Sequence, residues 1–158
     1  MTTRRHALAR RALERTAQAL LAAVGLPDAA LSLSLVGDRR MRTLNRLHRG
    51  RDRPTDVLSF PLYGSGSRSD PAVTRRSLLR AQRSEPEVLL GDVVISLDTA
   101  QRQADGYGAT LRSEVERLLV HGLLHLIGYD HEVARDRARM VAQERRLAAA
   151  IGLPWPYD

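Results

Sequence analysis

Hydrophobic positions along the chain follow two different periods, and together they predict a mixed α/β fold. From about Ala7 to Val24, apolar residues recur at helical spacing, as in an amphipathic helix. Residues 31–35 (Leu-Ser-Leu-Ser-Leu) alternate strictly between apolar and polar, which is typical of a half-buried strand. Residues 57–60 predict a short strand, and the apolar run over residues 88–95 predicts a central strand.

Further helices are predicted in the sequence before and after the central strand. Asp38 is placed to cap a helix whose buried face would carry Met41, Leu44 and Leu47. A short helix is expected over residues 99–105, a long one over 110–127 and a last one over 133–150. The long helix has a stripe of small and apolar residues that should face the core: Leu111, Val115, Leu118, Gly122 and Leu126.

The second and third predicted strands are separated by a segment of different composition. Residues 62–88 are rich in Gly, Ser, Arg and Pro, which predicts a mobile surface loop with a helical turn near Leu78. The chain has 158 residues, enough to bury about two-thirds of its unfolded surface in one core. We therefore expect a single domain over residues 1–158, an α/β (α+β) sandwich with a small mixed sheet and about five helices.

Three of the five histidines lie within the eleven residues 121–131, in the spacing H-x3-H-x5-H. Residues four apart share one face of a helix, so His121 and His125 can point at the same ion. Gly128 is suited to end the helix in a left-handed turn that would return His131 to the same point. Three neutral imidazoles with an open fourth position form a common catalytic zinc set, which predicts one Zn²⁺ per chain in a cleft.

The same spacing occurs in a class of zinc proteases, but one position differs in its chemistry. Those enzymes carry glutamate after the first histidine, where it acts as the general base. Here that position is Gly122. The predicted metal ligands are therefore kept while the protease base is absent, which makes a zinc peptidase the weaker alternative. Three neutral imidazoles leave the positive charge of the ion uncompensated, and such an ion binds anionic oxygen well, which favours phosphoester or acyl substrates.

Composition limits the remaining functions. The chain has 25 basic and 18 acidic residues, a formal charge of +7, and every basic residue is arginine. Such a surface suits polyanions, although a bias toward arginine would produce the same charge. Cysteine is absent, so disulfide partners and thiolate ligands are excluded. No run is long enough to span a bilayer and no clean signal core follows the basic start, so we expect a cytoplasmic location and no membrane partner.

Several polar residues near the motif are candidates for the chemistry. An arginine-rich loop leads directly into the strand at residue 57, and an arginine there can hold a phosphate beside the ion. Asp130 is either a carboxylate that orients a ligand or acts as base, or a cap for the following helix. Glu114 is expected to be solvated, His48 to lie on the surface, and Met140 to pack in the core.

Four stretches together resemble the bacterial YbeY family of rRNA maturation factors, which are metal-dependent endoribonucleases. They are Leu44 to Pro61 with its PTDVLSFP end, residues 90–95 (LGDVVI), the HGLLHLIGYDH element at residues 121–131, and Met140-x-x-x-Glu144. The resemblance implies an α/β sandwich with zinc held in a cleft by His121, His125 and His131. It also matches Arg49 to an arginine that the family needs for function.

The resemblance implies a nuclease that cuts single-stranded RNA during 16S rRNA 3′-end maturation and ribosome quality control. Its partners would be rRNA, the small ribosomal subunit and assembly proteins, with Arg51 and Arg53 as further RNA-binding candidates. A ribosome-assembly binding factor with a structural zinc is the alternative. Two departures are a missing or very short first strand and a longer, Arg/Ser-rich stretch between Pro61 and Leu89.

Overall fold

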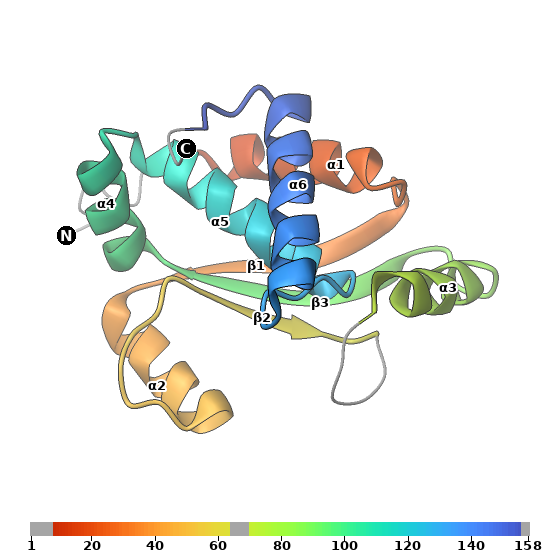
Figure 1. Ribbon diagram of the computed structural model, residues 1–158, viewed down its shortest axis with the longest axis horizontal. Helices are drawn as coiled ribbons and strands as arrows, with labels where there is room; N and C mark the ends of the chain where they lie inside the picture. The colour runs from red at the N-terminus through yellow and green to blue at the C-terminus, as the bar shows by residue number, and fades with distance from the viewer. Residues whose placement is uncertain (1–7, 64–69, 156–158) are drawn as a thin grey trace.

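A computed structural model describes residues 8–63 and 70–155 of the chain (Figure 1). Over these residues the chain forms six helices and a three-stranded sheet, which confirms the expected α+β class with one helix more than predicted. In chain order the elements are α1 (Arg10–Ala23), β1 (Ala29–Val36), α2 (Asp38–Arg49), β2 (Val57–Pro61), α3 (Pro71–Gln82), β3 (Val88–Ser96), α4 (Leu97–Tyr107), α5 (Leu111–Leu126) and α6 (Ala134–Ala150).

The strand with the longest apolar run lies in the middle of the sheet, as its sequence predicts. The strand order is β1-β3-β2, with β1 parallel and β2 antiparallel to β3. The register places Leu33 of β1 and Ser59 of β2 on either side of Val93. Neighbours on both sides satisfy the backbone polar groups of β3, so this strand can be buried on both faces.

Helices cover both faces of the sheet, but unequally. In Figure 1, α1, α5 and α6 lie on one face and α2 lies on the other. On the first face, Val93 and Ile95 belong to the main core, in which α5 is buried on nearly every side. On the second face, Met41 of α2 packs with Leu58 and Val94 in a smaller cluster. Because side chains alternate across a strand, the same strands serve both cores.

The prediction of a mobile loop over residues 62–88 is wrong in its middle, where the twelve-residue helix α3 forms. Asp70 caps this helix by accepting a backbone hydrogen bond at 2.8 Å. Thr74 and Leu78, one turn apart, are each only 1% exposed. The Ser- and Arg-rich composition obscured this narrow buried stripe. Residues 64–69 of the predicted loop lie outside the described part of the chain.

The prediction that Asp38 caps α2 is also wrong, because Gly37 occupies the N-cap position. The Asp38 carboxylate instead accepts hydrogen bonds from the hydroxyls of Ser96 at 2.7 Å and Thr99 at 2.6 Å. Burial alone would raise the pKa of Asp38, but these hydrogen bonds and the guanidinium of Arg102 at 2.8 Å lower it. Asp38 therefore ties the start of α2 to α4.

Leu47, predicted to share a buried face with Met41 and Leu44, is 68% exposed. Three-residue steps on a helix drift by about 60° each, so the third position turns away from the sheet. Residues 1–7 lie outside the described part of the chain. The expectation that the first strand is missing or very short therefore stays a prediction. Among the described helices, none combines the length and apolar character needed to cross a membrane.

Candidate metal centre and cleft

Helix α5 carries two of the predicted ligands on one side. Thr110 caps its start by accepting a hydrogen bond from the backbone N–H of Ser113 at 3.1 Å. Because His121 and His125 are about one turn apart, their rings leave the helix in nearly the same direction. Both are only partly buried, unlike most side chains of α5, so they face a surface that solvent can reach.

A glycine turn after α5 brings in the third histidine. Gly128 has a φ of +102°, and a Cβ built on it would lie 2.7 Å from Thr74 Oγ1. Glycine is therefore required both for the backbone conformation and for the close approach of α3. The chain reverses at this turn and places His131 beside the rings of α5, as the spacing predicts.

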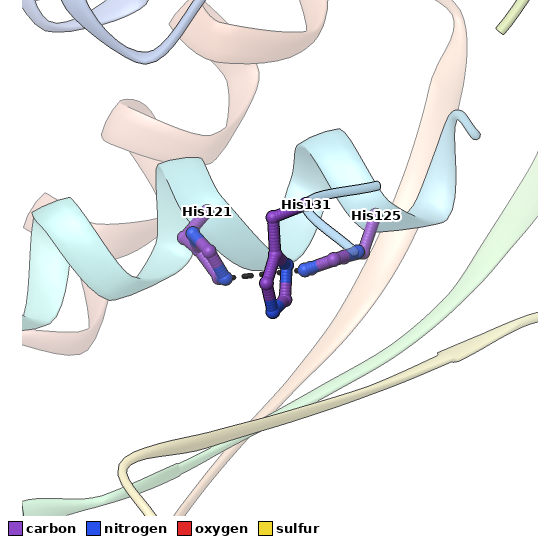
Figure 2. Close-up of side chains that lie close together, drawn as sticks. All are labelled: His121, His125 and His131. Atoms are coloured by element: carbon purple, nitrogen blue, oxygen red, sulfur yellow. Dashed lines mark hydrogen bonds between the residues drawn. The ribbon is translucent and has the colours of Figure 1, made fainter. Parts of the chain in front are cut away.

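The three imidazoles converge on one point (Figure 2). One ring nitrogen from each lies within 4.8 Å of the others. The Nε2 atoms of His121 and His125 are 3.1 Å apart. A tetrahedral zinc ion with Zn–N distances of about 2.0–2.1 Å separates its ligand nitrogens by roughly 3.3 Å. The donor set and the separation of its closest pair therefore fit a metal ion.

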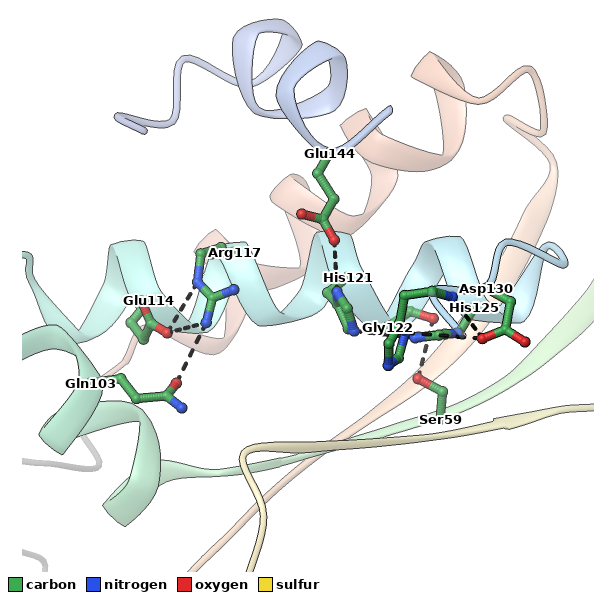
Figure 3. A network of polar contacts seen from close by, with 10 residues as sticks. Ser59, Gln103, Glu114, Arg117, His121, Gly122, His125, Asp130 and Glu144 are labelled. Carbon is green, nitrogen blue, oxygen red and sulfur yellow. Dashed lines mark hydrogen bonds and ion pairs between the residues drawn. The ribbon is translucent and has the colours of Figure 1, made fainter. Parts of the chain in front are cut away.

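Each imidazole has a different polar neighbour, and Figure 3 shows the contact of His121 with Glu144. The Nδ1 atom of His121 lies 2.7 Å from Glu144 Oε1 on α6, which makes Nδ1 the donor and leaves Nε2 free to face an ion. His125 has a backbone hydrogen bond with Tyr129. The Nδ1 atom of His131 is 4.0 Å from the Asp130 carboxylate.

The electrostatics of the cluster keep the ring of His125 neutral. Burial lowers the pKa of His125 to about 4, and the neighbouring rings of His121 and His131 act in the same direction. The carboxylate of Asp130 opposes this shift only in part. A neutral imidazole has the lone pair that a metal ligand requires, so His125 suits that role at neutral pH.

The histidines open into a cleft whose other wall carries arginines. The cavity measures about 740 Å³ and lies between the ligand side of α5 and a wall made by β2 and the loop before it. Its charged lining side chains, apart from the histidines, are Arg49, Arg51, Asp56, Asp130 and Glu132. The candidate metal ligands and two arginines thus face one space, although residues 49 and 121 are far apart in the chain.

Arg49 and Arg51 line this cleft, whereas Arg53 is not among its lining residues. Arg49 is the last residue of α2, and Gly50 follows with a left-handed φ of +68° that turns the chain. Asn45 is 2% exposed and donates a hydrogen bond to the backbone carbonyl of Arg53 at 2.8 Å. The backbone of the arginine-rich loop is therefore held by the buried side chain of Asn45, while the arginine side chains remain exposed.

Gly122 explains in structural terms why this site lacks the protease base. A Cβ at this position would lie 2.7 Å from Val93 Cγ1, because α5 packs directly on the sheet there. The backbone carbonyl of Gly122 also accepts a hydrogen bond from Ser59 Oγ at 3.3 Å. A glutamate side chain at position 122 would therefore meet the sheet rather than the open cleft.

One carboxylate, that of Glu114, differs from what its sequence position suggests. Glu114, expected to be solvated, is fully buried and pairs with Arg117 at 2.6 Å. Arg117 also donates a hydrogen bond to Gln103 (Figure 3). The amide of Gln103 in turn donates to the cleft residue Asp56 at 3.2 Å. The sequence signal for this ion pair is the i, i+3 spacing of Glu114 and Arg117, since residues three apart are neighbours on a helix; the burial of Glu114 has no such local signal.

Asp130 and Glu144 each contact a different histidine of the cluster. The alternative that Asp130 caps α6 is wrong, because Val133 occupies that N-cap position. The Asp130 carboxylate instead accepts a hydrogen bond from the backbone N–H of His131 at 2.7 Å and faces the cleft. Glu144 had no role assigned from sequence, since nothing local links it to a histidine 23 residues earlier.

Comparison with known proteins gives one consistent family. Residues 1–152 match the family model described as Endoribonuclease YbeY. Similar proteins described as Endoribonuclease YbeY include those of Anaeromyxobacter sp. strain Fw109-5 (51% identical, covering 92% of this chain and 66% of the relative) and Myxococcus xanthus (49%, covering 90% and 44%). The Moorella thermoacetica protein is 44% identical, covering 89% of this chain and 85% of its own length.

The chain thus spans less than two thirds of the length of some of these relatives. Among solved structures, the solution structure of TM1509 from Thermotoga maritima aligns with a TM-score of 0.56 at 23% identity. That alignment covers 96% of this chain and 91% of the other. It supports the fold.

Proposed function

Because the chain belongs to the YbeY endoribonuclease family, we propose that it is a zinc-dependent endoribonuclease that cuts single-stranded RNA. One observation carries the proposal: three converging histidines and Arg49 line the same cleft. We further propose that residues 1–158 form one hydrolase domain that acts in the cytoplasm on the 3′ end of 16S rRNA. Its partners would then be rRNA, the small ribosomal subunit and assembly proteins.

His121, His125 and His131 are the proposed ligands of one Zn²⁺ per chain. Nitrogen donors without thiolate or multiple carboxylates favour zinc among the common biological metals. When bound, such an ion would lower the pKa of water and offset negative charge on a phosphate. The hydrogen bond from His121 to Glu144 holds its ring in the orientation that a ligand needs.

Arg49 is the proposed catalytic arginine. Its guanidinium can donate two parallel hydrogen bonds to phosphate oxygens, and its charge offsets the charge that develops when the phosphate is attacked. Arg51 lines the same wall and would contact a neighbouring phosphate. Arg53 lies away from the cleft lining, so any contact it makes would be with RNA outside the cleft.

Asp130 is the candidate for either of two roles that a single substitution separates. If its carboxylate mainly orients His131, Asp130→Asn should weaken metal binding. If it accepts the proton of the attacking hydroxyl, the same variant should keep its metal and lose rate. The contact with the backbone N–H of His131 is available to either role.

Two alternatives make different predictions. A zinc peptidase is disfavoured because Gly122 faces the sheet and supplies no base. An assembly factor with a structural zinc would bind RNA without cutting it.

The deciding experiment incubates the purified protein, with and without chelator, with single-stranded RNA and with casein. We expect RNA cleavage that chelator abolishes and zinc restores, with casein intact. RNA binding without any metal-dependent cleavage would establish the binding factor instead.

A further inference from the structure

One face of α2 carries several arginines in addition to Arg49, the residue of this helix that lines the cleft. Residues 38–53 contain two aspartates and seven arginines, which are Arg39, Arg40, Arg42, Arg46, Arg49, Arg51 and Arg53. Positions 39, 42, 46 and 49 fall within about 80° of one another around the helix axis, at roughly 100° per residue. They form a stripe about 15 Å long that ends in the cleft at Arg49.

Both acidic residues of this segment already have partners. Asp38 is held by Ser96, Thr99 and Arg102 beside α4. Asp52 accepts two hydrogen bonds from Arg42, at 2.9 and 3.1 Å. The charge of Arg42 is therefore offset, and its contact with Asp52 shows that the stripe faces the loop after α2.

The other members of the stripe keep their charge available. Arg39, Arg46 and Arg49 are exposed and form no ion pair within residues 8–63 and 70–155. The hydrogen bonds from Arg42 lower the pKa of Asp52, and the charge of Arg46 adds a smaller effect in the same direction. Arg46 therefore lies near this carboxylate without forming an ion pair with it. Two exposed arginines elsewhere, Arg10 and Arg112, instead form ion pairs with Glu14 and Glu116.

We propose that Arg39 and Arg46 form a track on α2 for the RNA strand that extends beyond the cleft. The proposal rests on the proposed nuclease function and adds a binding surface outside its active site. A single strand whose phosphate sits at Arg49 can continue along the helix, where guanidinium groups meet its next phosphates. The spacing of about 10 Å between positions 39 and 46 suits an extended strand rather than one phosphate.

A matched pair of variants tests the track. Arg39→Gln/Arg46→Gln removes two charges from α2, and Arg76→Gln/Arg80→Gln removes two exposed charges from α3, a helix of the same length on the other side of the molecule (Figure 1). Each protein is titrated with single-stranded RNAs of about four and about sixteen nucleotides, a range typical of single-strand sites. Binding is followed by fluorescence anisotropy in chelator, so that it does not depend on cleavage.

The α2 double variant should bind the long RNA about tenfold more weakly than the unaltered protein, with a salt slope smaller by about 1.4, or roughly 0.7 per lost phosphate contact. It should bind the short RNA normally. The α3 double variant should bind both RNAs like the unaltered protein, and Arg39→Lys/Arg46→Lys should keep most of the salt slope because it keeps the charge.

Equal losses of affinity in the α2 and α3 variants, or an equal loss on both RNA lengths, would overturn the track. Because binding is read without metal, absence of cleavage would refute the nuclease and leave this result standing.

Discussion

The two walls of the cleft are built in opposite ways. On one wall, His121 and His125 project from a helix that is buried on nearly every side, and Glu144 fixes one ring from behind. On the other wall, the side chains of Arg49 and Arg51 are exposed, and Asn45 holds the backbone of the loop at Arg51 and Arg53. The difference teaches what each task requires: a metal ligand needs a lone pair in a fixed place, whereas a phosphate contact needs charge and reach.

The largest effect should come from removing a proposed metal ligand from the α5 wall of the cleft. His121→Ala and His125→Ala should each lose nearly all bound metal and, with it, RNA cleavage. Metal content after dialysis, measured by atomic emission, checks this directly. His48→Ala is the control, because His48 is exposed and packs against Phe60 away from the three rings. Full metal occupancy in both ligand variants would refute the site.

The next largest effect concerns Arg49 on the exposed wall. Arg49→Ala should slow single-turnover cleavage by about 10²-fold or more, since one lost donor to developing charge costs about 3 kcal/mol. RNA affinity should fall much less, because one exposed phosphate contact is weak in the ground state. Arg49→Lys should recover only part of the rate, as an ammonium lacks the two-pronged geometry. A variant that retains metal and cuts normally at saturation would make Arg49 a docking residue.

A smaller effect is expected behind the α5 wall of the cleft. Glu144→Gln should weaken metal binding about 10- to 100-fold, because a neutral amide holds the imidazole of His121 less firmly than a carboxylate. Competition with a metal-binding dye gives the affinity, and the visible spectrum of the cobalt form shows whether the ligands are retained. Glu116→Gln is the matched control, since Glu116 is 8% exposed, compared with 9% for Glu144, and pairs with Arg112 instead. Equal metal affinity in both variants would show that Glu144 only packs.

Beneath the exposed wall, Asn45→Ala should destabilise the fold by about 1–3 kcal/mol, the usual penalty for losing a buried hydrogen bond. Its zinc affinity should not change, because Asn45 lies on α2 beneath the loop and not beside the histidines. Urea unfolding measures the first effect and dye competition the second. Leu47→Ala on the same helix is the control, since its exposed side chain should contribute little.

The smallest effect is a pH-dependent one at the anchor of α2. The folded-state pKa of Asp38 is lowered, so its contribution to stability is present above the unfolded value near 3.8 and is lost as pH falls through the folded value. Asp38→Asn should therefore destabilise the protein by about 0.5–1.5 kcal/mol at pH 7. Thermal unfolding at pH 7 and near pH 3 should show the difference shrinking on acidification. A difference that is constant with pH would mean that the carboxylate charge contributes nothing.

The sequence by itself determined the parts of this protein that follow from local periodicity. Helical repeat fixes the relation of His121 to His125, and a glycine three residues later allows the reversal that returns His131. The alternating residues of β1 and the apolar run of β3 likewise predict strands, and the apolar run also predicts the burial of β3. These features depend on bond geometry and side-chain alternation over a few residues, so they can be recognised without knowing the fold.

Only the tertiary structure decided which polar groups meet. The contact between Glu144 and His121 joins two helices, the burial of Glu114 depends on its surroundings, and Asp38 bonds to residues about sixty positions away. The helix α3 is similarly defined by Thr74 and Leu78 packing into the fold rather than by its Arg- and Ser-rich composition. Burial and hydrogen-bond partners are set by how distant segments pack, because the cost of an unpaired buried group can be met only by a neighbour in space.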